Sequence, residues 1–148
     1  MDWIVKDEKS GRPILIDSHE FRIRYNFSLG WLENYYIGLD KGIIYGSKCD
    51  KCGSKYYPPR EKCVKCGLET NLFELPKEGI LITYTEINVK PQTFSDKEDY
   101  IVGVAELEGL KIVGYIEARF EDLKPGKKVL VKVKREGGSP KIFIIPIK

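Results

Sequence analysis

The chain has 148 residues, of which 42% are hydrophobic and 32% charged, with a formal net charge of +3 at pH 7. This length makes one medium domain or two small ones. No stretch approaches the ~18 consecutive apolar residues of a membrane span, and residues 1–9 lack the basic-then-apolar order of a signal peptide. These features predict a cytoplasmic protein without a membrane partner. The positive excess is small and spread out, which argues against the concentrated basic face of a nucleic-acid-binding domain.

The N-terminal region, residues 1–42, is predicted to contain an extended arm and then a helix. Gly11 and Pro13 argue against a helix at the start, so residues 1–17 are predicted to form the arm. Such an arm lies on the body of the protein or on a partner, or it frays as termini do.

The helix is predicted over residues 28–41, with Ser28 as its N-cap and Gly42 as the left-handed residue that ends it. Four apolar residues recur at helical spacing and predict one buried stripe. They are Leu29, Leu32, Tyr36 and Leu39. Three more apolar residues fall off this stripe, namely Trp31, Tyr35 and Ile37. This second apolar face is either clamped against the same chain or an interface with another protein.

The next region, residues 43–75, contains all four cysteines of the chain, in two C-x-x-C-G motifs. They are Cys49, Cys52, Cys63 and Cys66. Zinc favours four thiolates in a tetrahedron, and two such pairs are the usual way to supply them. Two redox dithiols, two disulfides and an iron S4 site are the alternatives. Because four thiolates fill the shell, the metal is predicted to be structural.

A linker rich in proline and glycine at residues 75–79 separates residues 43–75, the predicted zinc ribbon, from the last region, residues 76–148. Five strands are predicted there, with a break at residues 120–126 between the third and the fourth. They span residues 80–90, 101–108, 111–118, 128–135 and 141–147. Five strands with that break are typical of an OB-fold, a small barrel. The fold class is therefore mainly β (α+β), with an N-terminal helix, a zinc ribbon and a C-terminal five-stranded OB-fold barrel.

Several short motifs resemble family thirty-five of the domains of unknown function (DUF35). The most specific is Pro58-Pro59-Arg60 followed by the second cysteine pair, and Gly79-x-x-x-Thr83-Tyr84-Thr85 is another. The resemblance implies a rubredoxin-like zinc ribbon and an OB-fold behind N-terminal helices. It also implies a non-catalytic subunit that binds acyl-CoA and scaffolds a thiolase-like or other acyl-CoA enzyme in lipid or isoprenoid metabolism. Val64 stands where members commonly have proline, which leaves the metal ligands unchanged.

Three residues are candidates for binding CoA. Arg60 is held between two prolines and a metal-bound motif, and its guanidinium matches phosphate oxygens. Pairing with a nearby carboxylate or carbonyl is the alternative for this side chain. Phe94 and Tyr100 flank an acidic loop between the first two barrel strands. They are predicted to line a groove for the pantetheine arm or to stack on a base, or else to close the end of the barrel.

Catalysis by this chain alone is not expected. His19 is the only histidine, and no nucleophile elbow, P-loop or dinucleotide motif is present. The alternative function is a nucleic-acid-binding zinc-ribbon/OB-fold protein, for which Lys128, Lys132 and Lys134 form the only basic row. An electron carrier with iron in the four-sulfur site is a further alternative.

Overall fold

The structure is a computed structural model, and it describes residues 4–15, 22–89 and 98–147. The described strands are β1 (Ile4–Lys6), β2 (Pro13–Leu15), β3 (Tyr45–Lys48), β4 (Lys55–Tyr56), β5 (Asn71–Glu74), β6 (Glu78–Ile87), β7 (Tyr100–Leu107), β8 (Leu110–Ile116), β9 (Lys128–Glu136) and β10 (Ser139–Pro146). The described helical elements are the 3-10 turn η1 (Gly30–Leu32), the helix α1 (Glu33–Asp40) and the 3-10 turn η3 (Phe120–Asp122). The fold is therefore mainly β with one short α-helix, as expected.

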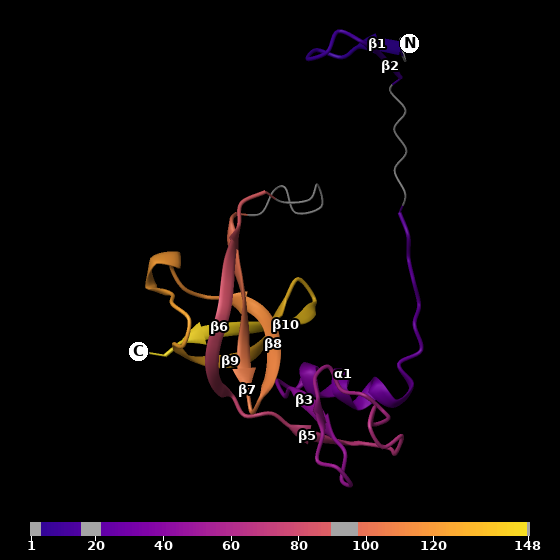
Figure 1. Ribbon diagram of the computed structural model, residues 1–148, viewed down its shortest axis with the longest axis vertical. Helices are drawn as coiled ribbons and strands as arrows, with labels where there is room; N and C mark the ends of the chain where they lie inside the picture. The colour runs from indigo at the N-terminus through magenta and orange to yellow at the C-terminus, as the bar shows by residue number, and fades with distance from the viewer. Residues whose placement is uncertain (1–3, 16–21, 90–97, 148) are drawn as a thin grey trace.

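The first described segment is a short hairpin rather than a single extended strand. β1 pairs with β2 in antiparallel register, with Ile4 opposite Leu15. In Figure 1 this hairpin lies apart from the rest of the molecule, and residues 22–29 form an extended segment. His19 lies outside the described residues.

The helix begins later than predicted. Ser28 does not cap it, because Gly30 has a φ of 54° and breaks the regular backbone between Ser28 and α1. The residues that precede the two helical elements make no side-chain capping bond. The predicted end is confirmed: Gly42 has a φ of 82°, and its N–H donates to the Leu39 carbonyl over 3.0 Å.

The buried face of α1 also differs from the predicted stripe. Tyr36 is exposed, whereas Tyr35 is buried and its hydroxyl lies 3.2 Å from that of Tyr57. The cause is a close approach at Gly38, where even a Cβ atom would overlap the ring of Tyr45. Since residues three apart share a helix face, this approach turns Tyr35 inward and Tyr36 outward.

The ribbon is a three-stranded antiparallel sheet in the order β4-β3-β5. Ser47 is opposite both Tyr56 and Leu72, and it is fully buried. β4 has only two residues.

The C-terminal strands close into a barrel in the order β10-β8-β7-β6-β9, which is shown in Figure 1. All neighbouring pairs are antiparallel except β10 with β8. β7 and β8 form a hairpin in which Leu107 is opposite Leu110. Its two loop residues, Glu108 and Gly109, have φ of 48° and 79°, the left-handed values that a tight primed turn requires. This is the predicted five-stranded OB-fold.

Barrel and ribbon share one hydrophobic core. Leu81, Leu107, Ile112 and Ile144 fill the barrel with almost no exposed surface. Ile44 and Leu75, which flank the ribbon sheet, belong to the same buried cluster, and the Leu75 N–H donates to the Ile44 carbonyl over 2.9 Å. The ribbon therefore packs on the barrel through apolar contacts. The division of the chain into three regions, with boundaries at residues 42/43 and 75/76, stays a prediction.

α1 packs near the same junction and is tied to the barrel by an ion pair between Asp40 and Arg135 of β9. Among the described residues, no helix has the length and apolar character needed to cross a membrane.

Candidate metal centre and neighbouring groove

The four cysteines converge on one point. All four Sγ atoms lie within 4.8 Å of one another, and those of Cys52 and Cys63 are 3.5 Å apart. Zinc bound to sulfur at roughly 2.3 Å in a tetrahedron places its sulfurs about 3.8 Å apart. The donor set and its spacing therefore fit one tetrahedral metal ion. These are the residues that the sequence predicts as ligands.

Two matching turns bring the thiols together. The Gly53 N–H donates to the Cys49 carbonyl over 2.8 Å, and the Gly67 N–H donates to the Cys63 carbonyl over 2.9 Å. Both glycines have positive φ, 74° and 68°, which a residue with a side chain adopts only with strain. The glycine after each cysteine pair is thus needed to fold the turn.

The electrostatics of the site call for a cation. Hydrogen bonding between Cys52 and the Ser54 hydroxyl lowers the pKa of Cys52 to about 6. The hydrogen bond that Cys66 makes with Cys52 raises the pKa of Cys66 to about 12, helped by burial. Four thiolates this close together repel one another unless a cation balances their charge. A divalent metal holds all four as thiolates, because coordinating thiols are deprotonated.

A tyrosine outside the ligand set orients one ligand. The Tyr56 hydroxyl lies 3.3 Å from the Cys63 Sγ atom and accepts the Val64 N–H over 3.2 Å. This contact with Tyr56 lowers the pKa of Cys63. Sequence reasoning missed Tyr56, because only the pairing of β4 with β3 tells it apart from its neighbour Tyr57.

The Pro-Pro-Arg segment before the second cysteine pair has a fixed backbone. The Arg60 N–H donates to the buried Ser47 hydroxyl over 2.9 Å, and the Thr70 hydroxyl donates to the Arg60 carbonyl. The Thr70 N–H in turn donates to the Glu61 carbonyl over 2.8 Å. The Arg60 residue itself is exposed.

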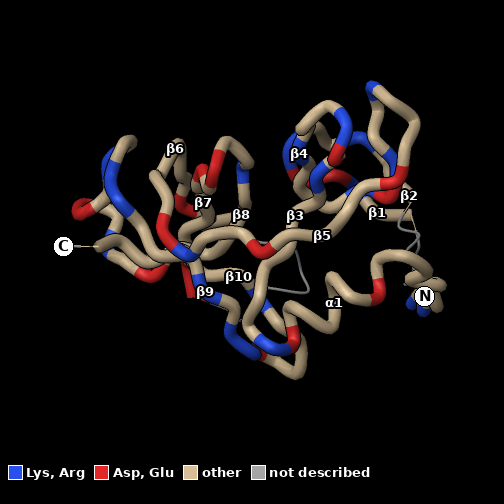
Figure 2. Tube along the Cα trace, turned by 90° about the horizontal axis from the view of Figure 1, so that it is seen from below, with Lys and Arg blue, Asp and Glu red and all other residues tan. Residues whose placement is uncertain are grey.

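A groove of about 440 Å³ runs along this segment. Its lining comprises Lys55, Tyr56, Tyr57, Pro58, Pro59 and Arg60. The lining has two cations, Lys55, which pairs with Glu108 over 3.4 Å, and Arg60; in Figure 2, Lys and Arg residues lie among Asp and Glu residues around β4. The Arg60 guanidinium lies 5.8 Å from the centre of the Tyr56 ring, and burial keeps Tyr57 neutral by raising its pKa. Chemically, the groove offers an apolar floor with positive charge at its edge.

The other predicted CoA-binding residues do not join this groove. Phe94 lies outside the described residues. Tyr100 begins β7, and its ring centre is 5.7 Å from that of Tyr115. The ribbon lies at the other end of β7, next to Leu107, and seven strand residues span roughly 23 Å. The structure therefore does not place Arg60 and Tyr100 in one compact site.

The three residues predicted for a partner interface lie in different environments. Ile37 is exposed, Trp31 is half-buried and Tyr35 is buried against Tyr57 of the same chain. The expectation that Tyr35 faces another protein is corrected by this packing. Ile37 and Tyr36 are the exposed apolar residues of α1.

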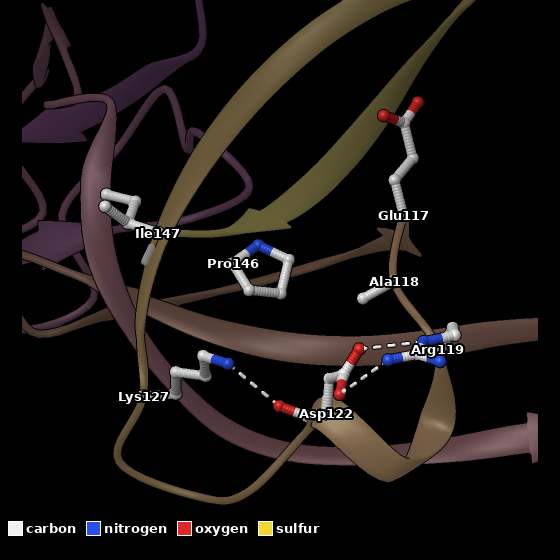
Figure 3. A pocket seen from close by; sticks show the side chains of 7 residues that line it. All are labelled: Glu117, Ala118, Arg119, Asp122, Lys127, Pro146 and Ile147. Atoms are coloured by element: carbon white, nitrogen blue, oxygen red, sulfur yellow. Dashed lines mark hydrogen bonds and ion pairs between the residues drawn. The ribbon is translucent and has the colours of Figure 1, made fainter.

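A second hollow of about 480 Å³ lies where η3 meets the ends of β8 and β10 (Figure 3). Three of its charged residues, Arg119, Asp122 and Lys127, bond to one another. The Arg119 Nε atom is 3.1 Å from Asp122, and the Lys127 ammonium donates to the Asp122 carbonyl over 2.9 Å. In Figure 3 these side chains close the turn between β8 and β9. The predicted basic row of Lys128, Lys132 and Lys134 is also partly engaged within the chain, since Lys134 forms an ion pair of 2.7 Å with Glu117.

Fold and site together define a class of protein, in which a four-cysteine metal ribbon precedes an OB-fold barrel. Comparison with known proteins leads to the same class. Residues 38–71 match the profile of the "ChsH2, rubredoxin-like zinc ribbon domain", and residues 73–134 match that of the "ChsH2, C-terminal OB-fold domain".

Curated relatives narrow the class to a family. A "DUF35 domain-containing scaffold protein" of Methanocaldococcus jannaschii is 34% identical over 94 residues, which are 61% of this chain and 67% of that protein. A protein of the same description from Methanothermobacter thermautotrophicus is 34% identical over 76 residues, or 49% and 57% of the two chains. The chain belongs to the DUF35 family.

Solved structures agree on the fold. A chain of the "Ltp2-ChsH2(DUF35) aldolase" superposes with a TM-score of 0.69 at 18% identity, covering 84% of this chain and 98% of that one. A DUF35 protein of unknown function from Sulfolobus solfataricus gives a TM-score of 0.57 at 22% identity, covering 78% and 84%.

Proposed function

We propose that this chain is a non-catalytic scaffold subunit that associates with a thiolase-like or other acyl-CoA enzyme. The observation that carries the proposal is its identity of 34% to a relative named as a scaffold protein. The fold it has in common with a chain of an aldolase complex supports association with an enzyme. Cytoplasmic location and a role in lipid or isoprenoid metabolism are further parts of the proposal.

The metal in this proposal is structural Zn²⁺, held by Cys49, Cys52, Cys63 and Cys66. Four thiolates complete its tetrahedral shell and leave no open position for a substrate. Bound there, the ion would supply folding free energy and no reaction step. The chain's own contribution is a rigid platform: the ion fixes the ribbon, and the shared core fixes the ribbon on the barrel.

The groove beside Arg60 is the proposed site for the phosphates of CoA. Ser47 and Thr70 hold the Arg60 backbone, so its guanidinium can bind a phosphate without a further loss of backbone entropy. An arginine fork matches phosphate oxygens in two hydrogen bonds. The apolar floor of tyrosine and proline rings suits the rest of a nucleotide. Tyr100 would then contact a separate part of the complex.

Two measurements test this function. Thermal unfolding with CoA should show protection, since a ligand at 100-fold its Kd adds about 2.7 kcal/mol to the free energy of unfolding. Arg60→Gln should reduce this protection, whereas the matched control Lys62→Gln, outside the groove, should not. A single-stranded oligonucleotide is the comparison ligand. Protection by the oligonucleotide alone, weakening steeply with salt, would support the nucleic-acid alternative.

The partner is tested by affinity purification of the tagged full chain from its source organism. A thiolase-like or other acyl-CoA enzyme should be recovered in stoichiometric amount and identified by mass spectrometry. Turnover of a thioester by the purified chain alone would contradict the non-catalytic role.

A further inference from the structure

The segment at residues 22–29 has a pattern that the proposed function does not use. Apolar residues alternate with polar ones: Ile23, Tyr25, Phe27 and Leu29 against Arg22, Arg24, Asn26 and Ser28. A period of two puts each set on one side of an extended chain. This exposed basic and apolar segment, residues 22–29, is called the arm below and is distinct from the arm predicted for residues 1–17.

The arm leaves its apolar side in water. Ile23 is 65% exposed, Tyr25 65% and Phe27 80%. The rings of Tyr25 and Phe27 lie 5.7 Å apart, so they form one continuous apolar edge. The arm belongs to none of the described sheets. An unpaired extended segment with such an edge is a template for association with another surface.

The outer side of the barrel has an apolar strip of matching geometry. Along β7, alternate residues are fully buried, and Tyr100, Val102 and Val104 point outward, half-exposed. Their partners on β8 are Tyr115, opposite Val102, and Val113, opposite Val104. Val113 is 64% exposed. A shallow hollow of about 150 Å³ lies over Val102, Val104 and Val113. The strip repeats every two strand residues, as the apolar edge of the arm does.

Charges at one end of the strip oppose those of the arm. The groove at this end, of about 530 Å³, is lined by Tyr100 and Tyr115 and also by Glu86 and Glu121. Arg119 in the same lining is already engaged by Asp122. Lys141 lies over the Tyr115 ring on the β10 side of this groove. Its positive charge repels incoming arginines, which are therefore expected on the opposite side, next to Glu86 of β6. The arm has two arginines and no acidic residue.

We propose that the arm of one copy of this chain lies along the β7–β8 strip of a second copy, with Arg22 and Arg24 next to Glu86 and Glu121. Two observations carry this proposal. The arm and the strip are exposed apolar surfaces with the same two-residue period, and the charged residues beside them are of opposite sign. In Figure 1 the arm runs from α1 past the barrel and away from it, so its apolar edge does not cover its own strip. Exchange of arms between two copies forms the contact twice and closes a symmetric dimer. The proposal is independent of the scaffold function.

The experiment is a charge exchange on the full chain, read by sedimentation velocity over a range of concentrations. The unaltered chain should be a dimer that high salt weakens. Arg22→Glu with Arg24→Glu, and separately Glu86→Lys with Glu121→Lys, should each raise the dimer dissociation constant about tenfold or more, because like charges then face each other. Mixing the two variants should restore dimers, since both exchanged contacts are again between opposite charges.

Two controls separate this dimer from other causes. Phe27→Asp should abolish the dimer with an unchanged thermal midpoint of the monomer, whereas Ile14→Asp, also on the surface but outside the arm, should leave it intact. A chain that is monomeric at all concentrations would overturn the proposal. So would a dimer insensitive to both charge reversals. A mixture that stays monomeric would also overturn the proposal, because the arm would then contact its own barrel.

Discussion

Ribbon and barrel are both small β-sheet units, but they are stabilised in different ways. The barrel closes on itself and fills its interior with apolar side chains such as Leu81, Ile112 and Ile144. In the ribbon sheet, the fully buried residue is Ser47, and the most buried side chains nearby are the cysteines Cys49 and Cys63. A unit that buries so little apolar surface depends on cross-links for its folding free energy. The metal therefore stabilises the ribbon as the apolar core stabilises the barrel.

The largest effect is expected from the removal of a metal ligand. In Cys63→Ser, one thiolate is lost from a closed four-sulfur site, and we expect the ribbon to lose its metal and its fixed structure. The measurement is metal content by mass spectrometry together with amide signals by NMR, where ribbon signals should collapse and barrel signals should persist. Val64→Ala, exposed in the same turn, is the control. A Cys63→Ser protein that retains its ribbon signals would contradict the assigned role of the metal.

The barrel should respond to loss of core volume instead. Leu81 has no exposed surface, so Leu81→Ala should lower the free energy of unfolding by about 2–5 kcal/mol through lost transfer energy and a residual cavity. Val113→Ala, on the outside of the same barrel, should change it by less than about 0.5 kcal/mol. Chemical denaturation followed by far-UV circular dichroism measures both. Equal effects would mean that the barrel interior is not the main source of stability.

The junction between the two units is tested at Gly46. A Cβ atom there would lie 3.1 Å from Phe73, 3.1 Å from the Tyr56 carbonyl and 3.2 Å from Leu110 of the barrel. Gly46→Ala should therefore destabilise the protein by about 1–3 kcal/mol, the usual effect of overpacking. We expect ribbon and barrel to unfold in one transition in the parent protein and to separate in this variant. Two transitions already in the parent would argue against a shared core.

A smaller effect is expected from the hydroxyl that orients Cys63. Tyr56→Phe removes the contacts with the Cys63 sulfur and the Val64 N–H. Loss of such an outer partner reduces metal affinity by about tenfold, which competition with a chromogenic chelator can measure. Tyr36→Phe, with its ring exposed on α1, is the matched control and should leave the affinity unchanged.

The smallest effect concerns the ion pair that bridges the units on the surface. Lys55 and Glu108 are 3.4 Å apart and both partly exposed. A double-mutant cycle with Lys55→Ala and Glu108→Ala should give a coupling free energy of about 0–1 kcal/mol, falling with added salt. A larger coupling would show that charge, and not only the apolar core, holds the ribbon on the barrel.

Much of the site was predictable because its chemistry is local. Two C-x-x-C-G motifs specify four ligands and two left-handed turns, whatever the rest of the chain does. The Glu108-Gly109 hairpin and the end of α1 at Gly42 are likewise set by residues next to one another. The strands of the barrel follow from their alternating burial, as in β9, where Val129 and Val131 are buried and Lys132 and Lys134 are exposed.

Tertiary structure decided what depends on contacts between distant residues. The approach of Gly38 to Tyr45 selects the buried face of α1, and no periodicity within the helix predicts it. Ile44 and Leu75 are 31 positions apart and join the ribbon to the barrel core only after both sheets have formed. The length of β7 likewise separates Arg60 from Tyr100, which the sequence alone had assigned to one ligand. Ligand identity and turn conformation are written in neighbouring residues, whereas packing partners exist only once the chain has folded.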